Sequence, residues 1–253
     1  MVAGLAAVAL LSACSNTAPD TAESADSAAE GGELTVFAAA SLHQVFEDLG
    51  AEFEDETGTT VSFSFAGSSD LVAQMQGGAP ADVFASADEA NMEKMTSAGL
   101  MAGQPQNFAT NTLTIVTAPD NPKGITDLAS LGGDDIDLVI CAPAVPCGAA
   151  SQAVAERAGV TLAPVSEENA VTDVLGKVTS GQADAGLVYS TDAVGAGDDV
   201  AIVDFPEAAD VVNVYPIGIL DDAEHPEAAQ QWVDFVLSET GQKALADAGF
   251  GAA

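Results

Sequence analysis

Short apolar strands alternate with amphipathic helices from Leu34 to the end of the sequence, and this order constrains the fold more than any other feature. Residues 34–37 predict a strand, and the apolar residues that follow recur at the spacing of one helix face. That face consists of Leu42, Val45, Phe46, Leu49 and Phe53. Because strand, turn and helix then repeat, we expect an α/β protein with mostly parallel sheets that helices cover on both faces.

Further elements follow the same order. Strands are expected at 60–65, 82–86, 113–116, 138–140, 186–189, 200–203 and 211–220. Helices are expected at 70–76, 89–98, 126–130, 148–158, 167–179 and 190–194, with two more in 226–249. The order restarts near Asn111 and near Asn213, which predicts that the chain crosses to a second lobe and returns. We expect lobe 1 to comprise 33–112 and 214–253, and lobe 2 to comprise 113–213, with a ligand cleft between them.

The charge of the chain is strongly acidic. It has 39 Asp and Glu residues against 5 Lys and Arg residues, a formal net charge of −34. No basic patch can be assembled from so few cations, which argues against nucleic-acid binding and against electrostatic adhesion to anionic lipid. The length is compatible with a monomer, which we expect.

The first residues predict export. Residues 1–14 are apolar and end in Leu11-Ser-Ala-Cys14, which resembles a bacterial lipobox, although no Lys or Arg precedes the apolar stretch. Residues 15–32 are small, polar and acidic, as in a disordered tether. We expect a lipoprotein anchored through Cys14 to the outer face of the cytoplasmic membrane. The alternative is an ordinary cleaved signal with an incidental cysteine.

Two further cysteines close a short segment, Cys141-Ala-Pro-Ala-Val-Pro-Cys147. With Cys14 consumed by lipid, they are an even pair in an oxidising compartment, which favours a small disulfide loop. Metal binding is the alternative, but His43 and His225 are distant in sequence and the spacing is not a standard zinc spacing.

The turn Phe37-Ala-Ala-Ala-Ser-Leu42 has the composition of an anion site. Ser41 is expected at the N-cap of the helix, and the small residues leave backbone N–H groups uncovered at the carboxyl end of a strand. The alternative is a well-capped helix without a ligand.

Four more places resemble this turn. They are Gly67-Ser68-Ser69, Pro146-Cys147-Gly148, Asn169-Ala170-Val171 and Tyr189. Ligands of open α/β sheets collect at the carboxyl ends of strands, so these places can converge with Ser41. Each also has a plain structural explanation as a turn, a disulfide loop, a helix start or a core tyrosine. None carries a Lys or Arg, so an anion would be held by neutral donors.

Signs of other chemistry are few. The sequence contains no G-x-S-x-G, H-E-x-x-H or G-x-x-x-x-G-K-[ST] motif. Asp134-Asp135-Ile-Asp137 matches no EF-hand loop and is expected to be a solvated acidic loop. A hydrolase that uses Ser41 with His43 is a remote alternative, because side chains two residues apart at a helix start point in different directions.

Several segments resemble the periplasmic molybdate-binding proteins of ABC importers. They are Val36-Phe-Ala-Ala-Ala-Ser-Leu42, Phe65-Ala-Gly-Ser-Ser69, Gly78-Ala-Pro-Ala-Asp-Val-Phe-Ala-Ser-Ala-Asp88, Gly186-Leu-Val-Tyr-Ser-Thr-Asp-Ala193 and Gly241-Gln-Lys-Ala-Leu-Ala-Asp-Ala-Gly-Phe250. The resemblance implies a two-lobed class II solute-binding fold that closes on tetrahedral molybdate or tungstate. It also implies a membrane permease as partner, no catalytic activity and no cofactor apart from the ligand.

The resemblance also implies ligand-binding residues. Ser41 and Ser68 match serines that donate both a backbone N–H and a hydroxyl, and Tyr189 matches a tyrosine that donates its phenol. Cys147 and Val171 fall where the family uses backbone N–H groups. The cysteine pair departs from better-known members. Sulfate and phosphate remain alternative ligands, and protonated phosphate would need a carboxylate acceptor, for which Asp70 and Asp173 are near enough in sequence.

Overall fold

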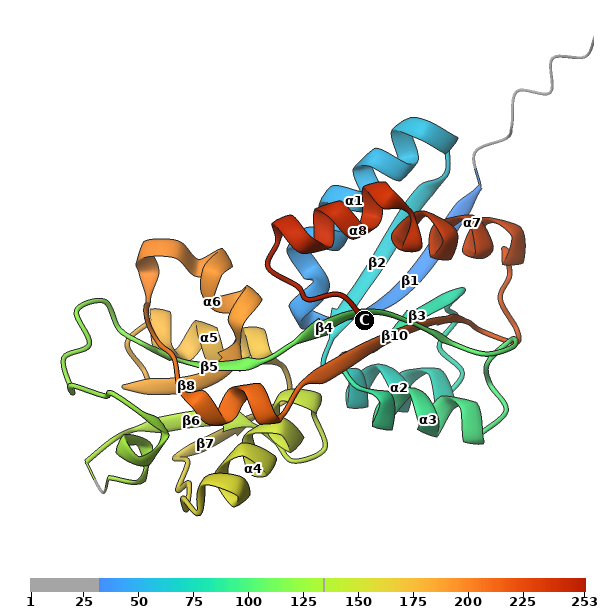
Figure 1. Cartoon of the computed structure of the whole chain (residues 1–253). Coiled ribbons are helices and arrows are strands. Elements are labelled where there is room, and N and C mark those ends of the chain that lie inside the picture. The colour runs from blue at the N-terminus through green and yellow to red at the C-terminus, as the bar shows by residue number, and fades with distance from the viewer. Residues whose placement is uncertain (1–31, 134) are drawn as a thin grey trace, which may run out of the picture. The chain divides into compact units, whose positions relative to one another are not determined.

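The computed structural model describes residues 32–133 and 135–253 (Figure 1). The expected lipid attachment site, Cys14, lies outside the described residues, as does the expected signal segment 1–14 and all of the tether 15–32 except Gly32. Among the helices of the described residues, none is long and apolar enough to cross a membrane.

The described residues form two mixed sheets of five strands each. The first sheet has the order β2-β1-β3-β10-β4, and the second has the order β7-β6-β8-β5-β9. In each sheet four strands run one way and a single strand, β10 or β5, runs the other way, so two of the four strand pairs are antiparallel. Each sheet is therefore parallel except for one antiparallel strand.

The residue ranges of the strands show where the chain passes from one sheet to the other. The first sheet contains β1 (Glu33–Ala39), β2 (Thr60–Ala66), β3 (Val83–Ala85), β4 (Gln106–Asn111) and β10 (Asn213–Ile219). The second contains β5 (Leu113–Thr117), β6 (Leu138–Cys141), β7 (Ser166–Glu168), β8 (Ala185–Tyr189) and β9 (Ala201–Val203). The chain leaves the first sheet at Thr112 and re-enters it at Asn213, and Figure 1 shows β4 continuing almost directly into β5.

Helices cover the sheets. The first lobe has the 3-10 turn η1 (Ala40–Leu42) and the helices α1 (His43–Thr57), α2 (Ser68–Gln76), α3 (Glu89–Ser97), α7 (Pro226–Leu237) and α8 (Glu239–Asp247). The second has α4 (Pro146–Ala158), α5 (Val171–Thr179), α6 (Ser190–Ala196) and the 3-10 turns η2 (Leu128–Gly132), η3 (Gly197–Asp199) and η4 (Pro206–Asp210). In Figure 1, α1, α7 and α8 lie on one face of the first sheet, and α2 and α3 lie on the other.

The core of the first lobe explains why α1 forms where the sequence predicts it. All five residues of the expected apolar face are buried. Phe46 and Phe53 pack edge-on against Trp232 of α7, with ring centroids 5.5 and 5.3 Å apart. Such aromatic contacts contribute about 0.5–1.5 kcal/mol beyond simple burial. This packing holds the start of α1 at the carboxyl end of β1.

Two expectations about local structure were wrong. Residues 167–179 do not form one helix, because residues 166–168 pair with β6 as strand β7 and α5 begins only at Val171. The strand β4 was not expected from its sequence, and it forms by pairing with β10. In both places hydrogen bonds to a distant strand override a weak local preference.

Candidate functional site

One small pocket brings together all five residues expected at the site. Ser41, Ser68, Cys147, Val171 and Tyr189 line it together with six small or apolar neighbours. The neighbours are Ala39, Ala40, Gly67, Ala87, Val145 and Pro146. The space between these atoms is about 190 Å³, part of it at the open mouth. The cavity proper has a volume of only about 10 Å³, against about 300–1,000 Å³ for pockets of drug-sized ligands, so only a very small ligand suits it.

Helix starts surround the pocket from both lobes. Ser68 and Val171 are the first residues of α2 and α5, Cys147 is the second residue of α4, and Ser41 lies in the turn that leads into α1. Backbone N–H groups at such positions have no partner within the helix. None of the turn and loop hydrogen bonds of the described residues uses these four N–H groups. The pocket therefore gathers free donors and the positive ends of helix dipoles, which favour an anion.

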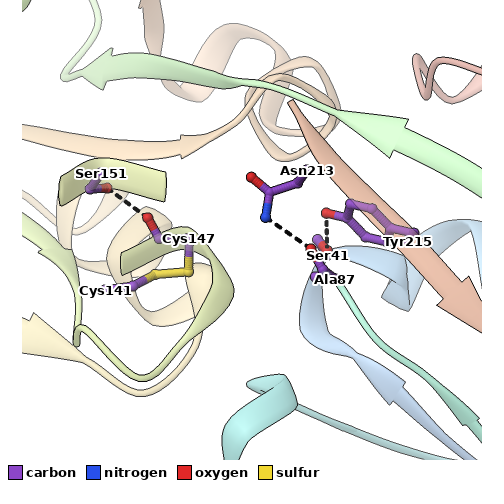
Figure 2. Close-up of a disulfide and its surroundings, with 7 residues drawn as sticks. All are labelled: Ser41, Ala87, Cys141, Cys147, Ser151, Asn213 and Tyr215. Atoms are coloured by element: carbon purple, nitrogen blue, oxygen red, sulfur yellow. Dashed lines mark hydrogen bonds between the residues drawn. A yellow bond between two sulfur atoms is a disulfide. The ribbon is translucent and has the colours of Figure 1, made fainter. Parts of the chain in front are cut away.

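Both serine hydroxyls have a partner behind the pocket. The Ser68 Oγ accepts the backbone N–H of Ala87 at 3.0 Å, so its own proton is free for a ligand. The Ser41 Oγ lies 2.9 Å from the phenol oxygen of Tyr215 (Figure 2). The expectation that Ser41 caps the helix was wrong, because a 3-10 turn intervenes and Leu42 stands before α1. The Ser41 hydroxyl is thereby freed for contacts with Tyr215 and the pocket.

Tyr189 is the last residue of β8, and its side chain is buried. Within the described part of the chain its hydroxyl has no hydrogen-bond partner. Burial, with smaller contributions from Tyr215, Asp88 and Asp192, raises the pKa of the Tyr189 phenol well above its ordinary value. The phenol is therefore a neutral donor, and an unsatisfied buried hydroxyl at a pocket wall is suited to a ligand that accepts a hydrogen bond.

The two lobes lie very close together at Gly67. A Cβ atom on this glycine would lie 2.0 Å from the carbonyl oxygen of Asn169 and 3.3 Å from Val145, both in the second lobe. The φ angle of Gly67 is −60°, which any residue can adopt, so close approach and not backbone conformation requires the glycine. Sequence reasoning identified Gly67 only as part of a turn, since nothing local signals a neighbour in the other lobe.

A disulfide shapes the loop that presents Cys147. Cys141 at the end of β6 is bonded to Cys147 in the first turn of α4 (Figure 2). The Ser151 hydroxyl donates to the Cys147 carbonyl at 2.7 Å. A Cβ on Gly148 would lie 1.9 Å from the Ala142 carbonyl, so the loop is packed tightly on itself. The bond uses both sulfurs, and the described residues contain no group of three His, Cys, Asp or Glu side chains that could hold a metal ion.

Charged groups surround the pocket but do not line it. Within residues 32–133 and 135–253, no Lys or Arg contributes to its wall, and Lys177 and Lys123 pair instead with Glu168 and Asp184. The carboxylates Asp70 and Asp173 line an adjoining groove that shares Ala40 and Gly67 with the pocket. The donor set therefore consists of amides, hydroxyls and a phenol.

His43 lies in the same groove and not in the pocket. It packs against Phe65, with ring centroids 4.7 Å apart and the planes tilted by 55°, and lies 3.6 Å from the Glu47 carboxylate. The Ser41 hydroxyl bonds to Tyr215 and not to His43. The two residues therefore lack the hydrogen bond that an activated serine needs, which argues against the hydrolase alternative.

One buried carboxyl lies close behind the site. The helix α6 begins directly after Tyr189, and Asp192 lies in its first turn. The Asp192 Oδ2 is buried without a partner among the described residues. Burial raises the pKa of Asp192 to about 7. The shift favours the neutral form of this carboxyl, which lowers its repulsion of an anion in the pocket.

Two lobes joined by two crossing segments, with helix starts from both facing one small pocket, define the class of two-lobed solute-binding proteins. The structure superposes on the periplasmic molybdate-binding protein of Azotobacter vinelandii with a TM-score of 0.76 at 24% identity, over 87% of this chain and 99% of that chain. That likeness establishes the fold.

Sequence comparison establishes the family. The family described as bacterial extracellular solute-binding protein matches residues 34–251, and this chain belongs to it. The molybdate-binding protein ModA of Mycobacterium tuberculosis (strain ATCC 25618 / H37Rv) is 48% identical over 96% of this chain and 93% of that protein. ModA of Escherichia coli (strain K12) is 32% identical over 76% of this chain and 79% of that protein. The family consists of binding proteins.

Proposed function

We propose that this protein is the substrate-binding component of an ABC importer for molybdate or tungstate. The observation that carries the proposal is the convergence of donors from both lobes on one small pocket, which no cation of the described residues lines. These donors include the buried phenol of Tyr189, which has no partner in that part of the chain. Relatives that are named molybdate-binding proteins support the choice of ligand. The ligand acts as cargo, and the function needs no catalytic group or cofactor.

The donor set explains how an acidic protein can hold a dianion. Hydrogen bonds to a charged acceptor contribute about 1.5–3 kcal/mol each, and the helix dipoles add to them. Charges on the exterior are screened beyond about 8–10 Å at moderate salt. Several such bonds in a closed pocket can therefore outweigh the repulsion from a net charge of −34.

The same donors disfavour a protonated oxyanion. Hydrogen phosphate carries an O–H group that needs an acceptor, and the pocket wall contains no carboxylate. Asp70 and Asp173 line the adjoining groove and not the pocket. Sulfate has the charge and shape of molybdate but is smaller, so we expect the size of the closed pocket to decide between them.

Ligand binding would favour the closed arrangement of the lobes. We assign residues 33–112 and 213–253 to lobe 1 and residues 113–212 to lobe 2, one residue from the expected boundary because Asn213 begins β10 of the first sheet. The two lobes supply different donors to the same ligand. A ligand that contacts both lobes binds the closed state better than the open state and shifts the equilibrium toward it. The closed form would then deliver the ligand to a permease in the membrane.

We also propose that the protein is an exported, monomeric lipoprotein. Leu11-Ser-Ala-Cys14 supports lipid attachment at Cys14, and the polar composition of 15–32 is suited to a tether. The Cys141–Cys147 bond is in keeping with an oxidising compartment. A Cys14→Ser variant that stays in the membrane fraction would contradict the anchor.

Calorimetric titration of the purified protein tests the ligand. Molybdate, tungstate, sulfate and phosphate are titrated separately into ligand-free protein under the same buffer conditions. We expect molybdate and tungstate to bind at least about 100-fold more tightly than sulfate, a difference of about 2.7 kcal/mol, and phosphate to bind more weakly still. Equal affinity for sulfate and molybdate would contradict the assignment to molybdate.

A further inference from the structure

Strand β10 lies behind both serines of the pocket. Tyr215 contacts the Ser41 hydroxyl directly at 2.9 Å. Asn213, two residues earlier on the same strand, donates its Nδ2–H to the Ala87 carbonyl at 2.9 Å, and the Ala87 N–H in turn donates to Ser68 at 3.0 Å. Figure 2 shows Asn213 and Tyr215 with these partners. Neither residue lines the pocket.

The two serines differ in what fixes the direction of their hydroxyls. The Ala87 N–H can only donate, so Ser68 must accept from it and is left to donate its own proton toward the ligand. The partner of Ser41 is a phenol, which can donate or accept. The direction of the Ser41 hydroxyl therefore depends on Tyr215.

An oxyanion in the pocket is compatible with only one of the two directions of the Ser41 hydroxyl. If Ser41 gave its proton to Tyr215, oxygen lone pairs of Ser41 would face the negative ligand. If Tyr215 donates to Ser41, the Ser41 proton is free for the ligand, and the two hydrogen bonds strengthen each other in a chain. Tyr215 is fully buried, and this burial raises the pKa of its phenol above the ordinary value, so the proton needed for donation stays in place.

We propose that Tyr215 is a positioning residue that keeps the Ser41 hydroxyl as a donor to the bound oxyanion. This inference rests on the proposed function. The packing of the ring supports it, because Phe108, Tyr189 and Phe250 pack edge-on against Tyr215 with centroids 6.2, 5.9 and 5.5 Å away. These contacts hold the ring and thereby its hydroxyl, which lies 2.9 Å from the Ser41 Oγ.

A double-mutant cycle tests this role. Molybdate affinity is measured by calorimetry for wild type, Tyr215→Phe, Ser41→Ala and the double variant. We expect Tyr215→Phe to weaken binding about tenfold in the wild-type background and less than about twofold in the Ser41→Ala background. A general loosening of the core would cost the same in both backgrounds, so the difference separates positioning from packing.

Thr114→Val is the matched control. Thr114 is also a buried hydroxyl residue with hydrogen bonds, to the Val203 carbonyl and to Asp204, but it lies on β5 away from the pocket lining. We expect this variant to keep wild-type affinity. Thermal unfolding of each ligand-free variant shows that all of them are folded at the temperature of the titration.

The possible results distinguish a failure of the Tyr215 role from a failure of the proposed molybdate binding. Wild-type affinity in Tyr215→Phe, or an equal loss in both backgrounds, overturns the positioning role while molybdate binding by the wild type still stands. A wild-type protein that does not bind molybdate overturns the proposed function, and the inference is overturned with it.

Discussion

The two lobes supply donors to the same pocket but prepare them differently. In the first lobe, the Ser41 and Ser68 hydroxyls already have hydrogen-bond partners, Tyr215 and Ala87. In the second lobe, a disulfide holds the loop that presents the Cys147 amide, while the Tyr189 hydroxyl is buried without a partner in the described residues. The hydroxyls of the first half are thus already hydrogen-bonded, whereas the phenol of the second half lacks an acceptor among the residues that the structure describes.

This difference suggests an order of events. An anion can first bind to the oriented serines and free amides of the first lobe at little cost in reorganisation. Closure then brings the Tyr189 phenol to the ligand, which satisfies a donor that would otherwise be buried at a cost of about 1–3 kcal/mol. The ligand therefore stabilises the closed arrangement chiefly through the second lobe.

The largest expected effect comes from breaking the contact between the lobes. Gly67→Ala places a methyl group 2.0 Å from the Asn169 carbonyl oxygen. This clash can be relieved only if the backbone of one or both lobes moves. We expect a loss of molybdate affinity of at least about 100-fold, because the lobes cannot close fully. Calorimetric titration measures the loss.

Gly176→Ala is a matched glycine control. Gly176 lies within α5, and a Cβ there meets nothing within 4 Å. We expect unchanged affinity and a stability gain of about 0.5–1 kcal/mol. A Gly67→Ala protein with wild-type affinity would show that the approach of Gly67 to Asn169 is not needed for binding.

The next two variants compare the Tyr189 phenol, which has no partner among the described residues, with the hydrogen-bonded Ser68 hydroxyl. Tyr189→Phe removes the phenol donor, so we expect molybdate affinity to fall about 10–100-fold, a loss of about 1.5–3 kcal/mol. The free energy of unfolding of the ligand-free protein should not fall, because the removed hydroxyl has no partner there. Calorimetry and denaturant unfolding give the two quantities.

Ser68→Ala is the counterpart in the first lobe. It removes a ligand donor and also leaves the Ala87 N–H without its acceptor. We expect about tenfold weaker binding together with a loss of stability of about 1 kcal/mol. If both variants lose stability to the same degree, the contrast between oriented and unpartnered donors is wrong.

The smallest effect on binding is expected from the disulfide. In the Cys141→Ser/Cys147→Ser double variant the loop between β6 and α4 is no longer closed covalently. The chain-entropy estimate for so short a loop is about 2 kcal/mol of folding stability. Molybdate affinity should fall only a few-fold, because the N–H of residue 147 remains at a helix start.

Serine at both positions keeps the loop polar and avoids unpaired thiols. As a control, free-thiol titration of the unfolded wild type shows whether Cys141 and Cys147 are bonded in the purified protein. A loss of affinity as large as that of Tyr189→Phe would show that the disulfide positions the second-lobe donors more strongly than the helix start does.

Local patterns determined much of this protein. The apolar spacing in 42–53 predicted the buried face of α1, and the small residues beside Ser41, Ser68, Cys147 and Val171 marked the helix starts that line one pocket. Such patterns act within a few residues, since a helix face or a free N–H group depends on near neighbours in the chain. The scarcity of cations was likewise evident from composition.

Tertiary structure decided what depends on residues far apart in the chain. The pairing of β7 with β6 and of β4 with β10 overrode local preference, and the bond between Ser41 and Tyr215 joins residues 174 positions apart. The need for glycine at position 67 arises only when the second lobe approaches. The sequence by itself therefore determined which residues were expected at an anion site, and the packing of the two lobes decided that they line one pocket and how they are oriented, because orientation depends on contacts that no local pattern encodes.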